Sequence, residues 1–503
     1  MAQATDTEAD TFRPKARVPK GFRDRLAGEV ELEMEMIATL AALAARYGFS
    51  PLATSALEYA DALGKFLPDQ DRPNEGVYAF ADEDGDWLAL RYDHTAPLAR
   101  LVAERFDALP RPFRRYAFGS VWRNEKPGPG RFREFLQFDV DSVGAPSMAA
   151  DAELIAFLAE GLEAVGFARG DYILNVSNRF VAQAVMEAAG LDGADPALRL
   201  RVLRSIDKLD RLGIAGVREL LGPGRTDESG DFTKGAGLSA GQVDAIAGPL
   251  AASLAEGYTL ARLRADIGGG ATGARACDEL EQIFACLDAF GIGPDRARVT
   301  THVVRGIEYY TGPVFEAELT GTILGPDGAP MRIGSVGIGG RYDDLVMRFT
   351  GQTVPATGAS LGISRLIAAR LALAGEAEAA AGGTGVLVLV FDRDRLPDYV
   401  RMVRELREAG LPAELYLGGA GLKAQMKYAD RRGAAVAVME GGDEHARGEV
   451  TLKDLRLGAE MARSIADNRE WRQARPAQET VARGDLVPAV RAILERSGAG
   501  GGA

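Results

Sequence analysis

The segment RRYAFGSVWRNEKPGPGRFREFLQFDVDSV, residues 114–143, places two strand-like runs on either side of the turn-forming stretch NEKPGPG. Alternating runs separated by Pro and Gly are typical of a β-hairpin. In the second run, every other position belongs to one mainly polar row: Arg131, Arg133, Phe135, Gln137, Asp139 and Asp141. Because successive side chains of a strand point to opposite faces, we expect this row to cover one face of a sheet.

The composition of this row indicates more than a half-exposed strand, although simple alternation is also typical of such strands. The row combines two guanidiniums, an aromatic ring, an amide and two carboxylates. These are the groups needed to hold a triphosphate, an adenine and a polar amino acid together. We therefore interpret the hairpin as part of a site for phosphoryl chemistry, in which fixed charges do most of the work.

The flanking sequence predicts an α+β fold. Residues 92–143 and 314–345 mix short alternating runs with turn residues, which predicts strands of a largely antiparallel sheet. Residues 178–295 are rich in Ala, Leu, Arg and Asp and predict a helical insertion. A helix before the sheet is predicted by apolar residues at helical spacing: Val30, Met34, Ile37, Ala41 and Ala44.

The C-terminal part predicts a separate α/β domain. Apolar strands at 386–391, 413–417 and 435–439 alternate with helical patterns at 396–409 and 422–432. The preceding stretch 371–384 contains AEAAAGG, has little to bury and predicts a linker.

The bulk composition excludes several classes of protein. A net charge of −13 over 503 residues argues against nonspecific coating of nucleic acid, which needs a basic surface, but not against a selective RNA partner. Neither a signal peptide nor a run of about 18 apolar residues is apparent, so we expect a cytoplasmic protein with no membrane partner. The two cysteines, Cys277 and Cys286, form neither a disulfide framework nor a four-ligand zinc site.

The hairpin resembles motif 2 of the class II aminoacyl-tRNA synthetases, through FGSVWRNE (118–125) and GRFREFLQ (130–137). The resemblance implies an ATP site in which Arg123 grips the α-phosphate and is catalytic. It further implies that Glu125 lies beside the adenine amino group, Arg131 meets the γ-phosphate and Phe135 stacks on adenine. The loop 124–130 would approach the acceptor end of the tRNA.

Two further segments resemble the histidine signatures of the histidyl-tRNA synthetase family: VVRGIEYYTGPVFEAEL (303–319) and SVGIGGRYDDL (335–345). The resemblance implies that Arg305 contacts the α-phosphate and the histidine carboxylate and is the second catalytic residue. Tyr309 and Tyr310 would lie at the amino-acid pocket. Tyr342 and Asp141 would bind the two imidazole nitrogens, and the glycines of the second segment would let the substrate lie against the strand.

The stretch LRYDHTAPL (90–98) predicts a strand with Asp93 and Thr95 on one face. By the same resemblance these two residues, with Gln137, would hold the ammonium group of histidine. His94 would point to the opposite face, and we interpret it as structural. GASLGISRL (358–366) resembles motif 3, in which Arg365 would cover the adenine face opposite Phe135.

The C-terminal domain resembles the anticodon-binding domain of the synthetases for histidine, threonine, proline and glycine. Its helical pattern at 422–432 carries Lys423, Lys427 and Arg431 at i, i+4 and i+8, a basic stripe that we expect to contact tRNA. FSPLATSALE (49–58) fits the layout of motif 1, the dimer-forming motif, with Ser55 where the family usually has proline. The family therefore implies a homodimer.

The resemblance predicts a class II fold divided into named parts. They are a disordered tail (1–13), the first part of the catalytic core (14–177), the helical insertion (178–295), the second part of the core (296–370), the linker (371–384), the anticodon-binding domain (385–496) and a flexible tail (497–503). The predicted activity is histidine–tRNA ligase. ATP with Mg²⁺, histidine and tRNA-His are the implied substrates, and we expect no protein-bound metal, zinc or organic prosthetic group.

Three alternatives remain at this point. A noncatalytic synthetase-like regulatory subunit of histidine biosynthesis would typically lack the C-terminal domain and degrade the Arg305 segment. A synthetase for another amino acid would need a different pocket from the one formed by Tyr309, Tyr310, Tyr342 and Asp141. A purely RNA-binding module would have no use for the polar row of the hairpin.

Overall fold

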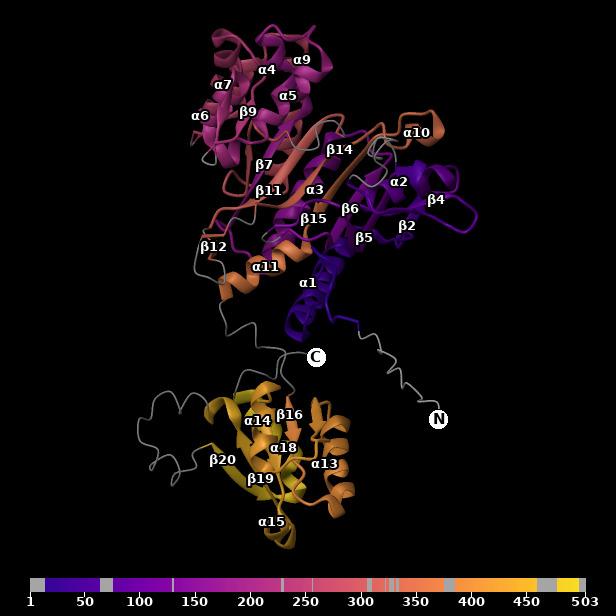
Figure 1. Cartoon of the computed structure of the whole chain (residues 1–503), viewed down its shortest axis with the longest axis vertical. Coiled ribbons are helices and arrows are strands. Elements are labelled where there is room, and N and C mark those ends of the chain that lie inside the picture. The colour runs from indigo at the N-terminus through magenta and orange to yellow at the C-terminus, as the bar shows by residue number, and fades with distance from the viewer. Residues whose placement is uncertain are drawn as a thin grey trace, which may run out of the picture. The chain divides into compact units, whose positions relative to one another are not determined.

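The structure is a computed structural model that describes residues 14–63, 76–128, 131–227, 230–255, 257–304, 310–321, 323–324, 330–331, 334–374, 385–458 and 477–496. The chain divides into two compact units, Met1–Leu373 and Ala374–Ala503 (Figure 1). The predicted tails at 1–13 and 497–503 lie outside the described residues. No helix in the described ranges is long and apolar enough to cross a membrane.

An eight-stranded sheet forms the centre of the first unit. In spatial order its strands are β1 (Ser50–Pro51), β5 (Phe113–Trp122), β6 (Glu134–Val143), β15 (Ala356–Leu361), β14 (Ser335–Arg341), β11 (Pro313–Leu319), β7 (Tyr172–Asn178) and β10 (Ala297–Val299). The pairings from β5 to β7 are antiparallel, and only the outer strands β1 and β10 pair in parallel. The predicted α+β class with a largely antiparallel sheet is confirmed.

One face of this sheet is covered by helices. They are α1 (Ala27–Arg46), α3 (Met148–Ala164) and α11 (Ile363–Ala374), whose apolar side chains join those of the strands in one large core (Figure 1). Phe138 and Val140 of β6 point into this core and are fully buried. The alternation predicted for the hairpin is therefore present, with its apolar row on the helix side and its polar row on the open face.

The helix predicted before the sheet is present as α1, and Ala44 of its predicted apolar stripe is buried while Ile37 and Ala41 pack against the core. The buried residues of α1 are Met36, Leu40, Leu43 and Ala44, whereas Met34 is 65% exposed. Leu and Ala also fill neighbouring positions of this helix, so two overlapping stripes fit its sequence, and only packing against α3 selects one of them.

The strand predicted at 90–98 is wrong. Strand β4 (Trp87–Leu90) ends at Leu90, and helix α2 spans Thr95–Glu104. Helix formation is favoured because the Asp93 carboxylate accepts hydrogen bonds from the backbone N–H groups of Thr95 (3.0 Å) and Ala96 (2.9 Å). Strand β4 belongs instead to a small sheet with β2 (Leu57–Tyr59) and β3 (Ala79–Ala81), next to the 3₁₀ turn Ala60–Leu63.

Between β7 and β10 the chain forms a largely helical subdomain (Figure 1). Its helices are α4 (Arg179–Ala188), α5 (Pro196–Ile206), α6 (Leu209–Leu221), α7 (Ala240–Ser253), α8 (Leu260–Ile267) and α9 (Ala271–Ala289), and β8 (Gly224–Thr226) pairs with β9 (Phe232–Lys234). Two short elements complete the first unit: the pair β12 (Ile323–Leu324) and β13 (Pro330–Met331), and helix α10 (Met347–Thr350).

The predicted linker begins too early, because α11 continues to Ala374. Leu371 and Ala372 pack against the core of the first unit, and this burial stabilises the last turn of the helix. The remaining residues of the predicted linker, 375–384, lie outside the described residues.

The second unit is an α/β domain with a five-stranded sheet of order β17, β16, β18, β19, β20. In that order the strands span Ala413–Leu415, Val386–Val388, Val436–Met439, Glu449–Asp454 and Gln478–Ala482. The helices are α13 (Leu396–Glu408), α14 (Leu422–Arg431), α15 (Gly442–Arg447) and α18 (Leu486–Arg496). Two 3₁₀ turns lie at Arg393–Arg395 and Arg483–Asp485. The first three strands pair in parallel as the alternating pattern predicts.

Candidate active site

Two adjoining hollows lie along the open face of the central sheet. Strand β6 runs past both of them, because Phe135 and Gln137 line the first hollow while Gln137, Asp139 and Asp141 line the second. This order follows from strand geometry, in which alternate residues share a face and each pair advances by about 7 Å. The polar row predicted from the sequence thus connects the two hollows.

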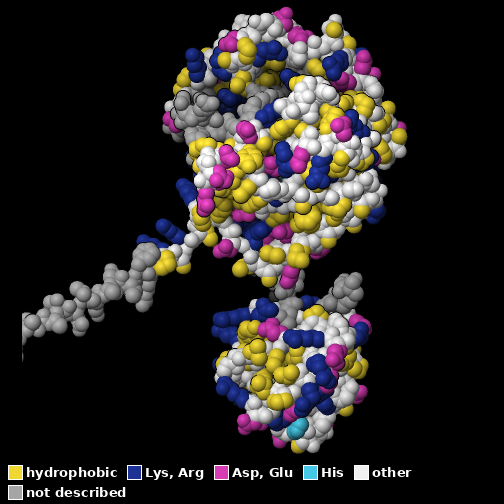
Figure 2. Space-filling model, turned by 90° about the vertical axis from the view of Figure 1, so that its right-hand side faces the viewer, with side chains coloured by type: hydrophobic (Ala, Val, Ile, Leu, Met, Phe, Trp, Pro, Cys, Tyr) yellow, Lys and Arg dark blue, Asp and Glu magenta, His cyan; other side chains and the backbone are white. Residues whose placement is uncertain are grey.

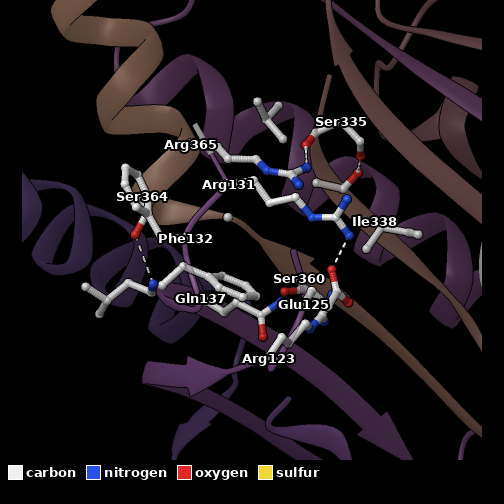
Figure 3. Close-up of a pocket in the computed structure, with 15 residues that line it drawn as sticks. Arg123, Glu125, Arg131, Phe132, Gln137, Ser335, Ile338, Ser360, Ser364 and Arg365 are labelled. Atoms are coloured by element: carbon white, nitrogen blue, oxygen red, sulfur yellow. Dashed lines mark hydrogen bonds and ion pairs between the residues drawn. The ribbon is translucent and has the colours of Figure 1, made fainter. Parts of the chain in front are cut away.

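The first hollow contains all five residues expected to bind ATP. Its lining includes Arg123, Glu125, Arg131 and Arg365, which are labelled in Figure 3, and also Phe135. These residues come from the β5–β6 hairpin and from the start of α11, which are far apart in the sequence but adjacent because β6 pairs with β15. Ser364, at the start of α11, accepts a hydrogen bond from the backbone N–H of Leu136 (2.9 Å) and so fixes the helix start against β6 (Figure 3).

The charged groups of the first hollow already have partners within the protein. Arg131 forms an ion pair with Glu125, and Arg365 donates to the backbone oxygen of Ser335 (Figure 3). The Arg123 guanidinium lies 5.2 Å from the centre of the Phe135 ring, and its Nε donates to the Tyr92 carbonyl (3.3 Å). The hollow is therefore built from cations and an aromatic face, with Glu125 as the carboxylate among its described lining residues.

The second hollow brings together most of the residues expected to bind histidine. Its described lining includes Asp93, Thr95, Gln137, Asp141, Tyr310 and Tyr342. Although Asp93 and Thr95 belong to a helix start rather than to a strand, both still face the hollow. Arg305 and Tyr309 lie outside the described residues.

The two hollows share one set of lining residues: Arg123, Glu125, Gln137, Ile338 and Ser360. Two different ligands that occupy the hollows would therefore meet beside the Arg123 guanidinium. A cation at such a junction can stabilise negative charge that develops between the two ligands. This shared boundary is the geometric feature expected of a site that joins two substrates.

The far end of the second hollow is organised around Asp141. The Tyr342 hydroxyl donates to one oxygen of this carboxylate, and the Arg115 guanidinium lies 2.7 Å from the other. Burial raises the pKa of Asp141, and the Arg115 charge and the Tyr342 hydrogen bond act against this shift. A carboxylate, a phenol and a guanidinium are thus held in one buried network.

Gly358 makes room for this network. A Cβ atom at this position would lie 2.1 Å from Asp141 Oδ1 and 3.0 Å from the Tyr342 ring. Two glycines of the segment 335–345 also make room for side chains of the protein itself. A Cβ at Gly339 would lie 2.2 Å from the Phe315 ring, and one at Gly340 would lie 2.8 Å from the Tyr310 ring. At these two positions the protein's own packing requires the absence of a side chain.

His94 is part of the scaffold, as expected. It is 2% exposed, its ring Nε2 lies 3.3 Å from the Gly119 carbonyl, and its own carbonyl accepts from Arg115 (3.0 Å). Burial, together with the Arg115 and Arg91 charges, lowers the pKa of His94 to about 3, so the ring is neutral at physiological pH. Among the described residues, His94 is not part of the lining of either hollow.

Sequence reasoning assigned no role to three residues of this site. Arg115 is completely buried behind Asp141, and Asp139 and Ser360 face each other across β6 and β15 in the second hollow. Asp139 stood in the predicted polar row, so alternation could have indicated it. Arg115 and Ser360 could not be found in this way, because their positions depend on the register of neighbouring strands.

In the second unit, the basic stripe predicted on one helix lies on α14. Lys423, Lys427 and Arg431 are all exposed, whereas Gln425 and Ala429 on the opposite side are buried. Figure 2 shows Lys and Arg side chains spread over the face of this unit that it presents.

Comparison with known proteins identifies the family. The family model described as "Histidyl-tRNA synthetase" matches residues 21–366, and that described as "Anticodon binding domain" matches residues 385–493. The chain belongs to the histidyl-tRNA synthetase family. The first match covers both hollows of the candidate site, and the second covers the α/β unit that carries the basic stripe.

Similarity to members of the histidyl-tRNA synthetase family extends over nearly the whole chain. A "Histidine--tRNA ligase" of Cereibacter sphaeroides is 58% identical over 489 residues, which cover 96% of this chain and 98% of the relative. One of Caulobacter vibrioides is 52% identical over 494 residues, covering 97% of this chain and 99% of the relative. The crystal structure of histidyl-tRNA synthetase from Nostoc sp. is similar with a TM-score of 0.70 at 26% identity, covering 95% of this chain and 100% of that one.

Proposed function

We propose that the protein activates histidine with ATP, forming histidyl-adenylate and pyrophosphate, and then transfers histidine to the 3′ end of tRNA-His. The observation that carries this function is the boundary shared by the two hollows, where Arg123 and Gln137 face both. Relatives named as histidine–tRNA ligases, at 52–58% identity over nearly the full length, favour this function over the noncatalytic regulatory alternative.

In the proposed nucleotide site, ATP occupies the first hollow. Adenine stacks between Phe135 and Arg365, an arrangement supported by the position of both residues in the lining and by the affinity of guanidiniums for aromatic faces. Glu125 receives the adenine amino group and Arg131 the γ-phosphate, so the ion pair between these two side chains exchanges partners when ATP binds.

In the proposed amino-acid site, histidine occupies the second hollow. Asp93, Thr95 and Gln137 hold the ammonium group near the shared boundary, while Asp141, Tyr310 and Tyr342 surround the ring. Arg305 and Tyr309 complete the site in this proposal. A buried site built from such groups rejects side chains that leave its polar atoms unpaired.

The reaction needs no nucleophile from the protein. The histidine carboxylate oxygen attacks the α-phosphorus, a new P–O bond forms, and the bond to the leaving pyrophosphate breaks. Arg123 stabilises the charge on the α-phosphate and aligns the two substrates, and Arg305 adds a second cation at the same place. ATP enters as its magnesium complex, with the metal held by phosphate oxygens. Glu125 is the carboxylate that the described lining of the first hollow offers, and this proposal assigns it to the adenine amino group and not to the metal.

The transfer step involves the rest of the chain. The loop 124–130, of which 129–130 lie outside the described residues, approaches the acceptor end of the tRNA, and the stripe Lys423, Lys427 and Arg431 contacts its anticodon arm. Exposed cations of this kind position an RNA through its phosphates. Because tRNA accepts the histidine, we place the reaction in the cytoplasm.

A homodimer is also part of the proposal. The small sheet of β2, β4 and β3 exposes large apolar side chains on one face, Tyr59 (57%) and Phe80 (46%), which are both cross-strand neighbours of Leu88. Figure 2 faces this side of the first unit and shows apolar side chains gathered over it. A second copy of the chain would cover such a patch, and sedimentation of the purified protein tests this association.

The activity is tested by histidine-dependent exchange of labelled pyrophosphate into ATP. We expect exchange with histidine and not with other amino acids, and we expect Arg305→Ala to lose most of the rate while it still binds ATP. Wild-type protein that shows no exchange, or that exchanges equally with other amino acids, would contradict the proposed function.

A further inference from the structure

The turn between β5 and β6 supplies a large part of the first hollow. Its residues in the lining are Arg123, Glu125, Arg131 and Phe132 (Figure 3). They lie beyond the last paired residues of the two strands, Trp122 and Glu134. Binding side chains on a turn keep a precise position only where packing and further hydrogen bonds hold the turn. The contacts of this turn with the rest of the chain therefore determine how well the nucleotide site is formed.

Arg133 is the member of the predicted polar row that lines neither hollow among the described residues. Its Nε instead donates to the Glu125 carbonyl (3.0 Å), and its Nη1 donates to the Lys20 carbonyl (3.3 Å). One guanidinium thus joins the backbone of a residue in the nucleotide site to a segment near the start of the chain.

That segment, residues 19–23, lies against the turn through further contacts, and we call it the strap. The Gly21 carbonyl accepts a hydrogen bond from the backbone N–H of Arg133 (2.9 Å). The Arg23 guanidinium lies 4.5 Å from the centre of the Phe132 ring. Because Phe132 lines the first hollow, this cation–π contact reaches the wall of the nucleotide site. The strap therefore holds the turn from outside the hairpin.

Gly21 permits this close approach of the strap. Its φ of +86° lies in the left-handed region that favours glycine, and a Cβ would lie 2.8 Å from Arg133 Cδ and 3.3 Å from Pro127 Cβ. The strap thus packs directly on the aliphatic part of the Arg133 side chain. A larger residue at position 21 would force that side chain to shift away from the carbonyl groups it holds.

The ion pair between Glu125 and Arg131 cannot fix the Glu125 carboxylate alone. The two side chains are 37% and 59% exposed, and exposed ion pairs are weak because water screens them and both side chains must give up conformational freedom. The pair must also open when ATP binds, since both members then contact the nucleotide in the proposed function. The backbone of Glu125 is the part that can stay in place in both states, and Arg133 is bonded to it.

We propose that Arg133 is a positioning residue for the nucleotide and that the strap is a supporting part of the nucleotide site. By holding the Glu125 carbonyl, Arg133 sets the place from which the Glu125 carboxylate meets the adenine amino group. This role rests on the proposed function, in which that carboxylate receives the amino group. Recognition of adenine thus depends on residues 19–23, none of which lines either hollow in the described part of the chain.

The test compares ATP with purine riboside 5′-triphosphate, which lacks only the 6-amino group. KM for each nucleotide and KM for histidine are measured by pyrophosphate exchange. We expect Arg133→Ala to raise KM for ATP about 5- to 30-fold, the range for the loss of one or two hydrogen bonds. Arg133→Lys retains one donor and should recover part of this loss. KM for purine riboside triphosphate should rise much less, and KM for histidine should stay within about twofold of wild type.

Gly21→Ala tests the same contact from the strap. Its Cβ strikes the Arg133 side chain, so it should weaken the preference for ATP in the same way and add little in an Arg133→Ala background. Gly170→Ala is the matched control, because Gly170 also has a left-handed φ, +95°, but a Cβ there meets no atom within 4 Å. Arg25→Ala is the control for the arginine, because Arg25 pairs with Glu33. Both controls should bind ATP as wild type does.

Two patterns would assign Arg133 a purely structural role and overturn the proposal: an equal rise in KM for both nucleotides, and a rise in KM for histidine that matches the rise for ATP. Unchanged KM for ATP in Arg133→Ala and Gly21→Ala would also overturn it, as would wild-type protein that binds both nucleotides equally well. If Arg133→Ala does not fold, Arg133→Lys and Gly21→Ala provide the same comparison. Wild-type protein without any exchange would instead contradict the proposed function itself.

Discussion

Replacement of Gly358 by alanine should damage histidine binding while leaving the nucleotide site intact. The added Cβ would lie 2.1 Å from Asp141 Oδ1, more than 1 Å closer than an ordinary contact, and Gly358 is held by its pairing with Asp141 on β6 and Gly340 on β14. The backbone therefore cannot move away easily, and the Asp141 side chain must shift instead.

The magnitude follows from what that shift disrupts. Overpacking alone costs about 1–3 kcal/mol, and a buried guanidinium that loses its carboxylate partner costs about 3–5 kcal/mol if the separation is complete. Because Asp141 needs to move by about 1 Å, we expect a partial loss of both contacts, with Tyr342 and with Arg115. A loss of about 2–3 kcal/mol in histidine binding corresponds to a KM for histidine raised about 30- to 150-fold.

The assay is steady-state pyrophosphate exchange with histidine and ATP varied separately. KM for ATP should stay within about twofold of wild type, since Gly358 lines only the second hollow. The same substitution in an Asp141→Ala background should cost far less, because the side chain that the new Cβ strikes is then absent. If Gly358→Ala binds histidine normally, or is equally harmful in the Asp141→Ala background, the explanation based on this contact is refuted.

Three further outcomes are expected. Arg365→Ala should raise KM for ATP about 5- to 30-fold, the worth of a guanidinium on an aromatic ring, without a matching change in KM for histidine; equal changes in both would argue against adenine stacking. Reversal of the charges at Lys423, Lys427 and Arg431 to Glu should raise KM for tRNA about tenfold and weaken its salt dependence, whereas pyrophosphate exchange should not respond. Asp139→Asn should stabilise the unliganded protein more at pH 8 than at pH 4. Burial raises the folded-state pKa of Asp139 from 3.8 to about 7. The contribution of Asp139 to the free energy of unfolding is therefore fully present below pH 4 and is lost as pH rises through 7, a difference on the order of 4 kcal/mol. Thermal midpoints measured across this range check it, and a stability difference independent of pH would contradict it.

Much of the fold could be predicted because its signals are local. Alternation along residues 131–141 identified the pocket-facing side of β6, and the repeating pattern after residue 385 identified the α/β unit, whose observed helices and strands differ from the predicted ones mainly at their ends. Both patterns reflect burial on one side of a regular element, which the sequence records directly.

The errors arose where tertiary contacts decide between local alternatives. LRYDHTAPL fits a strand by alternation, but capping by the Asp93 carboxylate favours the helix start at Thr95. In α1, Ile37, Ala41 and Ala44 of the predicted stripe contact the core, whereas Met34 is exposed because packing against α3 decides which apolar positions are buried. Arg115 stands two residues from the start of β5 with no local sign of importance, and only its register opposite Asp141 gives it a role.

The ion pair between Glu125 and Arg131 favours ligands that bind both side chains at once over ligands that bind only one of them. Under the proposed roles, an inorganic anion that captures Arg131 leaves Glu125 without a partner, whereas ATP supplies a phosphate to one member and an amino group to the other. Both side chains are substantially exposed, so the pair is worth at most about 1 kcal/mol, or roughly a fivefold preference. Free phosphate or pyrophosphate would therefore compete for this pocket slightly less well than its cations alone would allow, and a nucleotide with both ends intact would face no such penalty.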